Sequence, residues 1–266
     1  GFGPQILNQL YISRNTTNHN LLTINGDLTI QANAIVGRSG STGTSPEQQN
    51  LGRVNQLGGT VLIPNNVLDM GNREGSGWGN GIYDYRGGTL QVSLVGGAGI
   101  RLSAGGSAGT GGVGKFIMRN PASGGHVRAM DLNVAANASN PDGITTGVGI
   151  LEFHYENGGT RPFQLVRNLL INNGEVTTGT RSARLDLVLD AAPTVVDGIP
   201  QNLGLIDIDC FDDDFFVGSR GGVGSLGQYF SSADGSTLYD EGAIVSAQFG
   251  STIYNWAITY TGNITW

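Results

Sequence analysis

The residues best suited to ligand chemistry lie in one acidic and aromatic stretch in the C-terminal third of the chain. Carboxylates placed this close together repel one another unless they are protonated, spread apart or bridged by a cation. Calcium binds about six to eight oxygens, although this stretch lacks the glycine and glutamate spacing of an EF-hand loop. It therefore predicts a calcium site, a solvated acidic loop or a partner-binding face, and calcium is the only cofactor suggested. The carboxylates are those of Asp207, Asp209, Asp212, Asp213 and Asp214.

Residues that could support catalysis are dispersed along the sequence. The three histidines, His19, His126 and His154, form no ligand-spaced pair, so each is expected to be structural. Glycoside hydrolysis or lyase chemistry needs carboxylates, and a polysaccharide-degrading enzyme would cluster Asp and Arg in one groove. The sequence therefore predicts no catalytic residue and a protein that is not an enzyme. The arginines in question occur singly, at Arg119, Arg128, Arg161, Arg167, Arg181 and Arg184.

Three aromatic residues are candidates for contact with a surface glycan. Trp78 lies in a glycine-rich loop over residues 69–81, and Tyr83 and Tyr85 follow it closely. Trp256 instead falls in an alternating apolar run, which predicts a strand and a place in the core.

Alternating polar and apolar residues, the signature of strands, are widespread, whereas helical periodicity is almost absent. Leu22 and Ile24 are followed, after Gly26 and Asp27, by Leu28 and Ile30. This pattern predicts a strand, a tight bend and a second strand. The elements that must position any site are therefore β-strands joined by glycine corners.

A module of strand, Gly-Gly corner and strand recurs along the chain. Its Gly-Gly pairs begin at positions 58, 87, 124 and 158. The uneven steps between these positions fall within the roughly 20–50 residues typical of solenoid repeats, whose coils bury their apolar faces only by stacking. The predicted fold is all-β, a β-helix-like solenoid over residues 1–202 with a C-terminal β cap or small β-subdomain over 203–266. The alternative is a β-sandwich or jelly roll with ordinary hairpin turns.

Composition narrows the classes of protein and partner. Of 266 residues, 45 are glycine and 13% are charged, which argues against coiled coils and disordered acidic tails. The net charge of −7, without a basic stripe, argues against nucleic-acid binding, and no apolar run is long enough to span a membrane. The single cysteine, Cys210, is expected to be a core thiol. The scarcity of lysine and abundance of glycine, asparagine and threonine favour a secreted bacterial protein, extracellular or at the cell surface.

The Gly-Gly-Thr modules, Asn-Gln-Leu-Gly-Gly-Thr-Val at 55–61 and Tyr-Arg-Gly-Gly-Thr-Leu at 85–90, resemble the repeats of large secreted β-helix proteins. Such repeats occur in planctomycete-type surface proteins and are similar to those of autotransporter passengers. The ending at 254–263 resembles the strand and turn that close many of those domains. The resemblance covers about half the chain. It implies an extracellular fold, surface display and self-association or adhesion, and it supplies no catalytic residue.

The leading functional hypothesis is a secreted structural protein, a subunit that assembles with other copies of itself into a surface layer or filament. A donated strand would join the subunits by β-augmentation. The alternatives are an adhesin or carbohydrate-binding module that recognises surface glycans and, less favoured, a polysaccharide-degrading β-helix enzyme. The residues expected in the donated strand are Gln5, Ile6, Leu7, Leu10, Tyr11 and Ile12.

Overall fold

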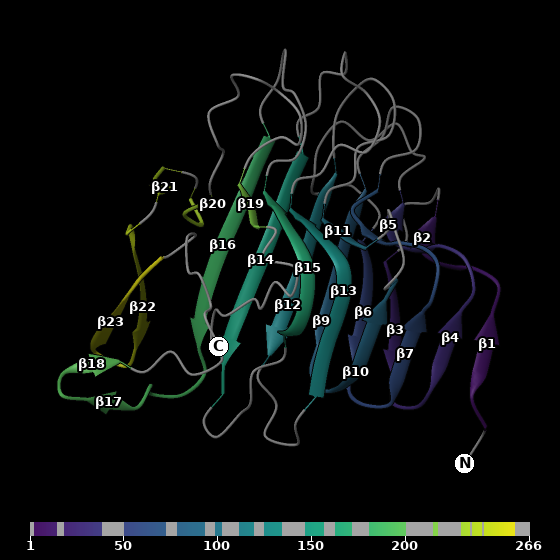
Figure 1. Ribbon diagram of the computed structural model, residues 1–266, viewed down its shortest axis with the longest axis horizontal. Coiled ribbons are helices and arrows are strands. Elements are labelled where there is room, and N and C mark those ends of the chain that lie inside the picture. The colour runs from purple at the N-terminus through teal and green to yellow at the C-terminus, as the bar shows by residue number, and fades with distance from the viewer. Residues whose placement is uncertain are drawn as a thin grey trace.

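In the computed structural model, the described part of the chain has all its regular structure as β-strands (Figure 1). No helix that could cross a membrane occurs in these described segments. The all-β class predicted from the alternating pattern is therefore confirmed. The segments described are 3–14, 19–38, 51–72, 79–93, 99–102, 112–119, 125–134, 147–156, 163–171, 181–200, 215–217, 230–234, 236–240 and 242–258.

Two large sheets and two small hairpins contain all the described strands. The 8-stranded sheet contains β3 (Asn20–Ile24), β6 (Leu51–Gln56), β9 (Asn80–Tyr85), β12 (Val113–Arg119), β14 (Gly147–Tyr155), β16 (Arg181–Leu189), β20 (Phe230–Ser231) and β21 (Leu238–Tyr239), in the spatial order of their numbers. The hairpins are β17 (Val195–Val196) with β18 (Ile199–Pro200) and β22 (Ile244–Phe249) with β23 (Thr252–Ala257).

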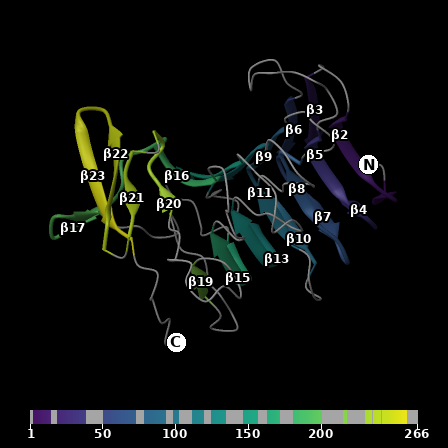
Figure 2. The ribbon, with the colours of Figure 1, turned by 90° about the horizontal axis from the view of Figure 1, so that it is seen from above.

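The 11-stranded sheet has two rows of strands that share one long member. One row holds β1 (Gln5–Leu7), β4 (Leu28–Ile30), β7 (Thr60–Ile63), β10 (Gly88–Val92) and β13 (Gly125–Val134), and continues to β15 (Phe163–Ile171) and β19 (Phe215–Val217). The other holds β2 (Leu10–Arg14), β5 (Ala34–Arg38), β8 (Leu68–Met70) and β11 (Ile100–Leu102), and also ends on β13. Figure 2 shows this sheet facing the 8-stranded sheet, which contains β6 and β9.

The strands from β3 to β11 repeat in sets of three. The sets β3–β5, β6–β8 and β9–β11 pair in parallel, each strand with its counterpart in the next set. The register joins Thr60 to Thr89 and Gly88 to Gly125, so equivalent positions of successive modules lie side by side. The strand β13 pairs with β10 through its first half and with β11 through its second half. Sandwiches and jelly rolls are antiparallel, so this parallel pairing does not fit that alternative.

Inward-facing side chains stack in columns because the parallel register repeats. One column in the 8-stranded sheet runs through Val54, Tyr83, Phe116, Leu151 and Leu185, all of them buried. The tyrosine and phenylalanine rings meet edge to face, with centroids 5.6 Å apart. These residues and the inward positions of the other large sheet form one hydrophobic cluster. Shared burial between neighbouring sets is the main source of stability in such a stack.

Glycines stack in columns at the corners. Gly59 and Gly88 each follow another glycine at the turn into β7 and β10, and both adopt a positive φ, +70° and +81°. This confirms the corner predicted for the first two Gly-Gly modules. Gly158 and Gly159 lie outside the described residues, as does Gly124. A second column lies near the beginning of strands β6, β9, β12 and β14 in the 8-stranded sheet. It aligns Gly52, Gly81, Gly114 and Gly149.

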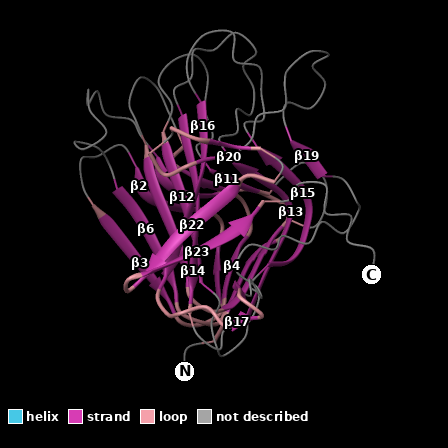
Figure 3. Ribbon diagram, turned by 90° about the vertical axis from the view of Figure 1, so that its left-hand side faces the viewer, coloured by secondary structure: helices cyan, strands magenta, loops and turns pink. Residues whose placement is uncertain are grey.

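The β22–β23 hairpin lies at the end of the molecule farthest from β1 (Figure 1), and it crosses in front of the large sheets in Figure 3. Its inward face, formed by Val245, Ala247 and Trp256, belongs to the same hydrophobic cluster as the large sheets. The prediction that Trp256 is a core residue is therefore confirmed, since 7% of it is exposed. The boundary at residue 203 lies in the undescribed segment 201–214 and stays a prediction.

Candidate functional site

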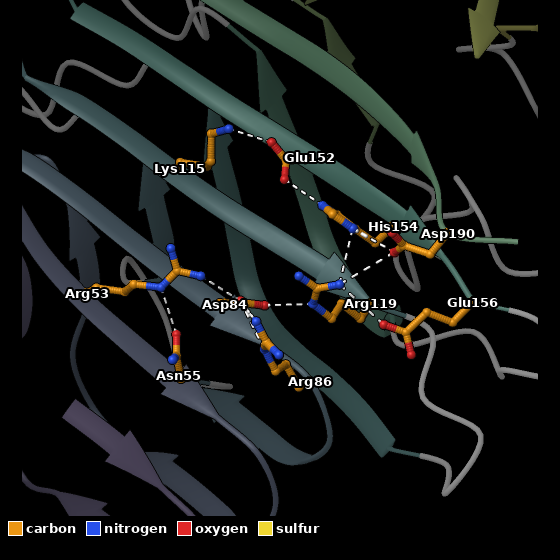
Figure 4. A network of polar contacts seen from close by, with 10 residues as sticks. All are labelled: Arg53, Asn55, Asp84, Arg86, Lys115, Arg119, Glu152, His154, Glu156 and Asp190. Atoms are coloured by element: carbon orange, nitrogen blue, oxygen red, sulfur yellow. Dashed lines mark hydrogen bonds and ion pairs between the residues drawn. The ribbon is translucent and has the colours of Figure 1, made fainter. Parts of the chain in front are cut away.

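A network of charged side chains covers part of the outer face of the 8-stranded sheet (Figure 4). Parallel register places Asn55 beside Asp84 and Arg119 beside His154, although members of each pair lie about one repeat apart in sequence. The network therefore comes from the four neighbouring strands β6, β9, β12 and β14 and from the residues that directly follow β9, β14 and β16. Its members are Arg53, Asn55, Asp84, Arg86, Lys115, Arg119, Glu152, His154, Glu156 and Asp190.

Asp84 is the centre of one half of the network. Its side chain is 0% exposed and accepts hydrogen bonds from Arg53 at 2.8 Å, Arg86 at 2.7 Å and Arg119 at 2.9 Å. Burial alone would raise the pKa of this carboxyl, but the hydrogen bonds and charges of Arg86 and Arg119 outweigh burial and lower the pKa. One ionised carboxylate thus holds three guanidinium groups together across β6, β9 and β12.

His154 is the centre of the other half. Its Nε2 lies 2.6 Å from Oε1 of Glu152, and its Nδ1 lies 2.8 Å from Oδ2 of Asp190. Ionised carboxylates only accept hydrogen bonds, so both ring nitrogens donate when the imidazole is protonated. Burial and the charge of Arg119, whose Nη1 is 3.1 Å from Nδ1, act to lower the pKa of His154. The two carboxylates prevail, and the pKa is raised above 6.5.

Glu152 links His154 to Lys115. It accepts hydrogen bonds from His154 and from the ammonium group of Lys115. Burial would raise the pKa of Glu152, but these two cationic partners lower it to about 2. The Glu152 side chain is thus ionised at neutral pH.

This arrangement favours a structural role, in which ion pairs hold neighbouring strands together, over acid–base chemistry. Four basic side chains, those of Arg53, Arg86, Lys115 and Arg119, face the four acidic side chains of Asp84, Glu152, Glu156 and Asp190. A general base works best with a pKa near the operating pH, whereas the pKa values of Asp84 and Glu152 both shift downward. Within the described segments, no group of three or more His, Cys, Asp or Glu side chains is arranged to hold a metal.

A second feature is the end of the stack that carries β1, β2 and β3. The strands β1 and β2 terminate the two rows of the 11-stranded sheet, and β3 terminates the 8-stranded sheet. Among the described strands, each of the three pairs with a later strand on one side only. Ile6 and Leu21, on β1 and β3, are 65% and 63% exposed. We call this set of three edges, at positions 5–7, 10–14 and 20–24, the open end.

The residues predicted to form a donated strand lie in the open end, but they are not free. Gln5, Ile6 and Leu7 are exposed and pair with β4 of the same chain. Residues 10–12 are half-buried, and Leu10 and Ile12 pack against the core. The donated-strand hypothesis therefore needs correction, because this segment is already an integral edge of its own sheet and offers a partner only its outer side.

The other predicted site residues are either buried or outside the described residues. Tyr83 and Tyr85, 2% and 0% exposed, point into the core, so the prediction that they contact a ligand is wrong. Tyr83 donates a 2.6 Å hydrogen bond to buried Gln56, and Tyr85 donates one of 2.6 Å to the carbonyl of Gly88. Trp78 lies outside the described residues, as do the five predicted calcium ligands, Asp207, Asp209, Asp212, Asp213 and Asp214.

The sequence matches no protein-family model, no curated protein and no solved structure. Geometry and chemistry therefore carry the functional argument. The charged network was not predicted, because Arg119 and its partners lie far from one another in the sequence. The one signal available was their outward position on strands one repeat apart, which the parallel register brings into adjacent rungs.

Proposed function

We propose that the chain is a β-solenoid subunit with the β22–β23 hairpin as its cap. The support is the strand order: sets of three strands from β3 to β11, and of two in β12–β13 and β14–β15, pair in parallel with the next set around one continuous core. The repeated Gly-Gly corners agree with this geometry, because a coil that turns sharply needs residues that accept a positive φ.

The proposed function is structural: an extracellular protein that associates with copies of itself through the open end. The observation that supports this proposal is that β1, β2 and β3, at one end of the stack, each pair with a described strand on one side. Unpaired backbone N–H and C=O groups on an edge form a template for another strand. The exposed side chains of Ile6 and Leu21 add apolar area that association would bury.

Location outside the cell rests on composition. The chain has one lysine, many glycines and a net charge of −7, which favour a secreted bacterial surface protein. Assembly into a layer or filament remains part of the proposal. Glycan binding has less support, because Tyr83 and Tyr85 are buried and cannot form an aromatic platform.

Sedimentation velocity over a wide range of protein concentration tests self-association. We expect the mass of the wild type to rise with concentration, and the double variant Ile6→Lys/Leu21→Lys to stay monomeric, because charged edge residues oppose strand pairing. The matched control is Val195→Lys/Val196→Lys, which places the same charges on two half-exposed valines of β17. A wild type that is monomeric at every concentration would contradict the proposal, as would a double variant that associates like the wild type.

A further inference from the structure

We infer that Arg53, Arg86 and Asn55 form a binding site for an acidic polysaccharide, in which the two guanidinium groups bind a carboxylate or sulfate group and the amide binds a sugar hydroxyl. This function is separate from self-association and does not involve β1, β2 or β3. It relies on charge, in place of the aromatic platform that the buried Tyr83 and Tyr85 cannot form. The choice of a polysaccharide as the source of the anion rests on the proposed extracellular location.

Arg53 and Arg86 keep donors that no described residue uses. Nε of Arg53 donates to Asn55 and Nη2 to Asp84, whereas Nε and Nη2 of Arg86 both donate to Asp84. A guanidinium group also carries N–H donors on Nη1. Within the described part of the chain, Nη1 of each arginine has no hydrogen-bond partner. The two side chains are 33% and 41% exposed, so a ligand can reach these donors.

Asp84 fixes the positions of both guanidinium groups while its own carboxylate stays out of a ligand's reach. The side chain is 0% exposed and accepts hydrogen bonds from Arg53 at 2.8 Å and from Arg86 at 2.7 Å. An arginine that binds an anion normally loses rotamer freedom on binding. Here much of that freedom is already lost when the protein folds, so the two arginines are preorganised for an anion.

Positive charge is concentrated on this side of the network. Arg53 and Arg86 share the single carboxylate of Asp84 with Arg119. The other carboxylates of the network lie on its far side, around His154 (Figure 4). The strand β6, which carries Arg53, contains no acidic residue. A protein with a net charge of −7 thus presents a local patch with more guanidinium groups than carboxylates.

The neighbours of the two arginines suit a sugar. Oδ1 of Asn55 accepts from Nε of Arg53, which leaves the Nδ2 donors of this amide without a partner among the described residues. The backbone amide of Arg86 donates to the carbonyl of Gln56, so Leu57 lies beside Arg86, and Leu57 is 45% exposed. These groups match the oxyanion, the hydroxyls and the apolar C–H face of an acidic sugar.

Isothermal titration calorimetry at low ionic strength tests the site with polygalacturonate, dextran sulfate and neutral dextran. We expect binding of a polyanion, no binding of dextran, and loss of binding at high ionic strength, because salt screens exposed charges. Polygalacturonate bound alone identifies a carboxylate as the ligand, dextran sulfate bound alone identifies a sulfate, and binding of both shows that the site accepts either group. Failure of both polyanions to bind would overturn the inference.

Two double variants distinguish this site from a general effect of charge. Arg53→Gln/Arg86→Gln should weaken binding at least about tenfold, because a hydrogen bond between charged groups is worth about a factor of ten or more in affinity. The matched control, Arg101→Gln/Arg128→Gln, removes the same charge from β11 and β13 of the other large sheet and should bind like the wild type. An equal loss of binding in the control would overturn the inference.

A third variant guards against loss of folding as the cause. Asn55→Asp keeps an acceptor for Nε of Arg53 but places a carboxylate in the site, so it should also lower the affinity at least about tenfold. Thermal melts check that the variant is folded. Binding as tight as that of the wild type would overturn the inference.

Two further measurements separate the polysaccharide and the proposed self-association from the anion site itself. Polyglutamate carries carboxylates without sugars, and if it binds as tightly as polygalacturonate, the choice of a polysaccharide is wrong. Sedimentation velocity without polymer measures self-association alone. A wild type that stays monomeric but binds a polyanion contradicts only the proposed function, and one that associates but binds no polyanion contradicts only this inference.

Discussion

Asp84 accepts a hydrogen bond of 2.9 Å from Nε of Arg119, a residue 35 positions later in the sequence. The two residues lie on adjacent strands, β9 and β12, so the contact exists only if the repeat is correctly in register. Arg53 and Arg86 converge on the same carboxylate. One buried negative charge thus fixes three strands of the outer face.

Replacing Asp84 by Asn should destabilise the fold by about 3 kcal/mol. The substitution leaves three guanidinium groups without their shared carboxylate, and removing one partner of a buried ion pair costs about 3–5 kcal/mol. Urea unfolding followed by circular dichroism measures the loss. Asp240→Asn, at an exposed position, is the control and should change stability by less than about 0.5 kcal/mol. Equal effects of the two substitutions would contradict the structural role of Asp84.

Stability should fall in acid because of Glu152. Its pKa is about 2 in the folded protein against an ordinary value of 4.5, so its contribution is complete above pH 4.5 and is lost as the pH falls toward 2. A shift of this size corresponds to at most about 3 kcal/mol. Unfolding free energies measured from pH 6 to pH 2 should show the slope, and Glu152→Gln should reduce it. An unchanged slope in that variant would show that other carboxylates cause the loss.

Stability should also fall in mild alkali because of His154. The pKa of this group is raised in the folded state, so its contribution is complete below pH 6.5 and is lost as the pH rises through the raised value. Melting temperatures between pH 6 and pH 9 should decline for the wild type and stay nearly level for His154→Gln. Titration of the imidazole by nuclear magnetic resonance checks the cause directly, and a midpoint below 6.5 would refute it.

A methyl group at Gly81 should be far more damaging than one at Gly26. A Cβ at Gly81 would lie 2.0 Å from the carbonyl oxygen of Val36 and 2.5 Å from the amide nitrogen of Gly71. A Cβ at Gly26 would meet nothing within 4 Å. We expect Gly81→Ala to cost about 3 kcal/mol or more, since backbone must move, and Gly26→Ala to be nearly neutral. Thermal melts of the two variants compare their stabilities, and equal melting temperatures would contradict the expectation.

Removing the hydroxyl of Tyr83 should cost about 1–3 kcal/mol, because Gln56 would keep a buried oxygen without its donor. The hydroxyl donates to Oε1 of Gln56 at 2.6 Å, and Nε2 of the same amide donates to the carbonyl of Thr89 at 3.0 Å. Unfolding of Tyr83→Phe in urea measures the loss. A change below about 0.5 kcal/mol would mean that the amide finds another partner.

Local pattern was enough to predict the strands and their corners. Alternation over Leu22, Ile24, Leu28 and Ile30 places three of these side chains fully in the core and one partly buried. The glycine pairs before Thr60 and Thr89 mark turns because tolerance of a positive φ is a property of the residue itself.

The charged network could not be predicted in the same way. Its contacts between strands join residues 31 to 71 positions apart, for example Arg53 with Asp84 and Arg119 with Asp190, and only the register brings them together. The glycine-rich segment before Tyr83 suggested a surface position for the tyrosines. Alternation in β9 instead turns Tyr83 and Tyr85 inward and Asp84 outward.

The parallel register is kept although successive repeats differ in length. Thr89 of β10 is aligned with Thr60 of β7 and with His126 of β13, so the second repeat is longer than the first. The strands keep their alignment, so the connections absorb the change. An evolving gene can therefore lengthen or replace a connection without shifting a single core side chain. The same tolerance predicts that a foreign peptide inserted into such a connection would leave the alignment of the strands on either side unchanged.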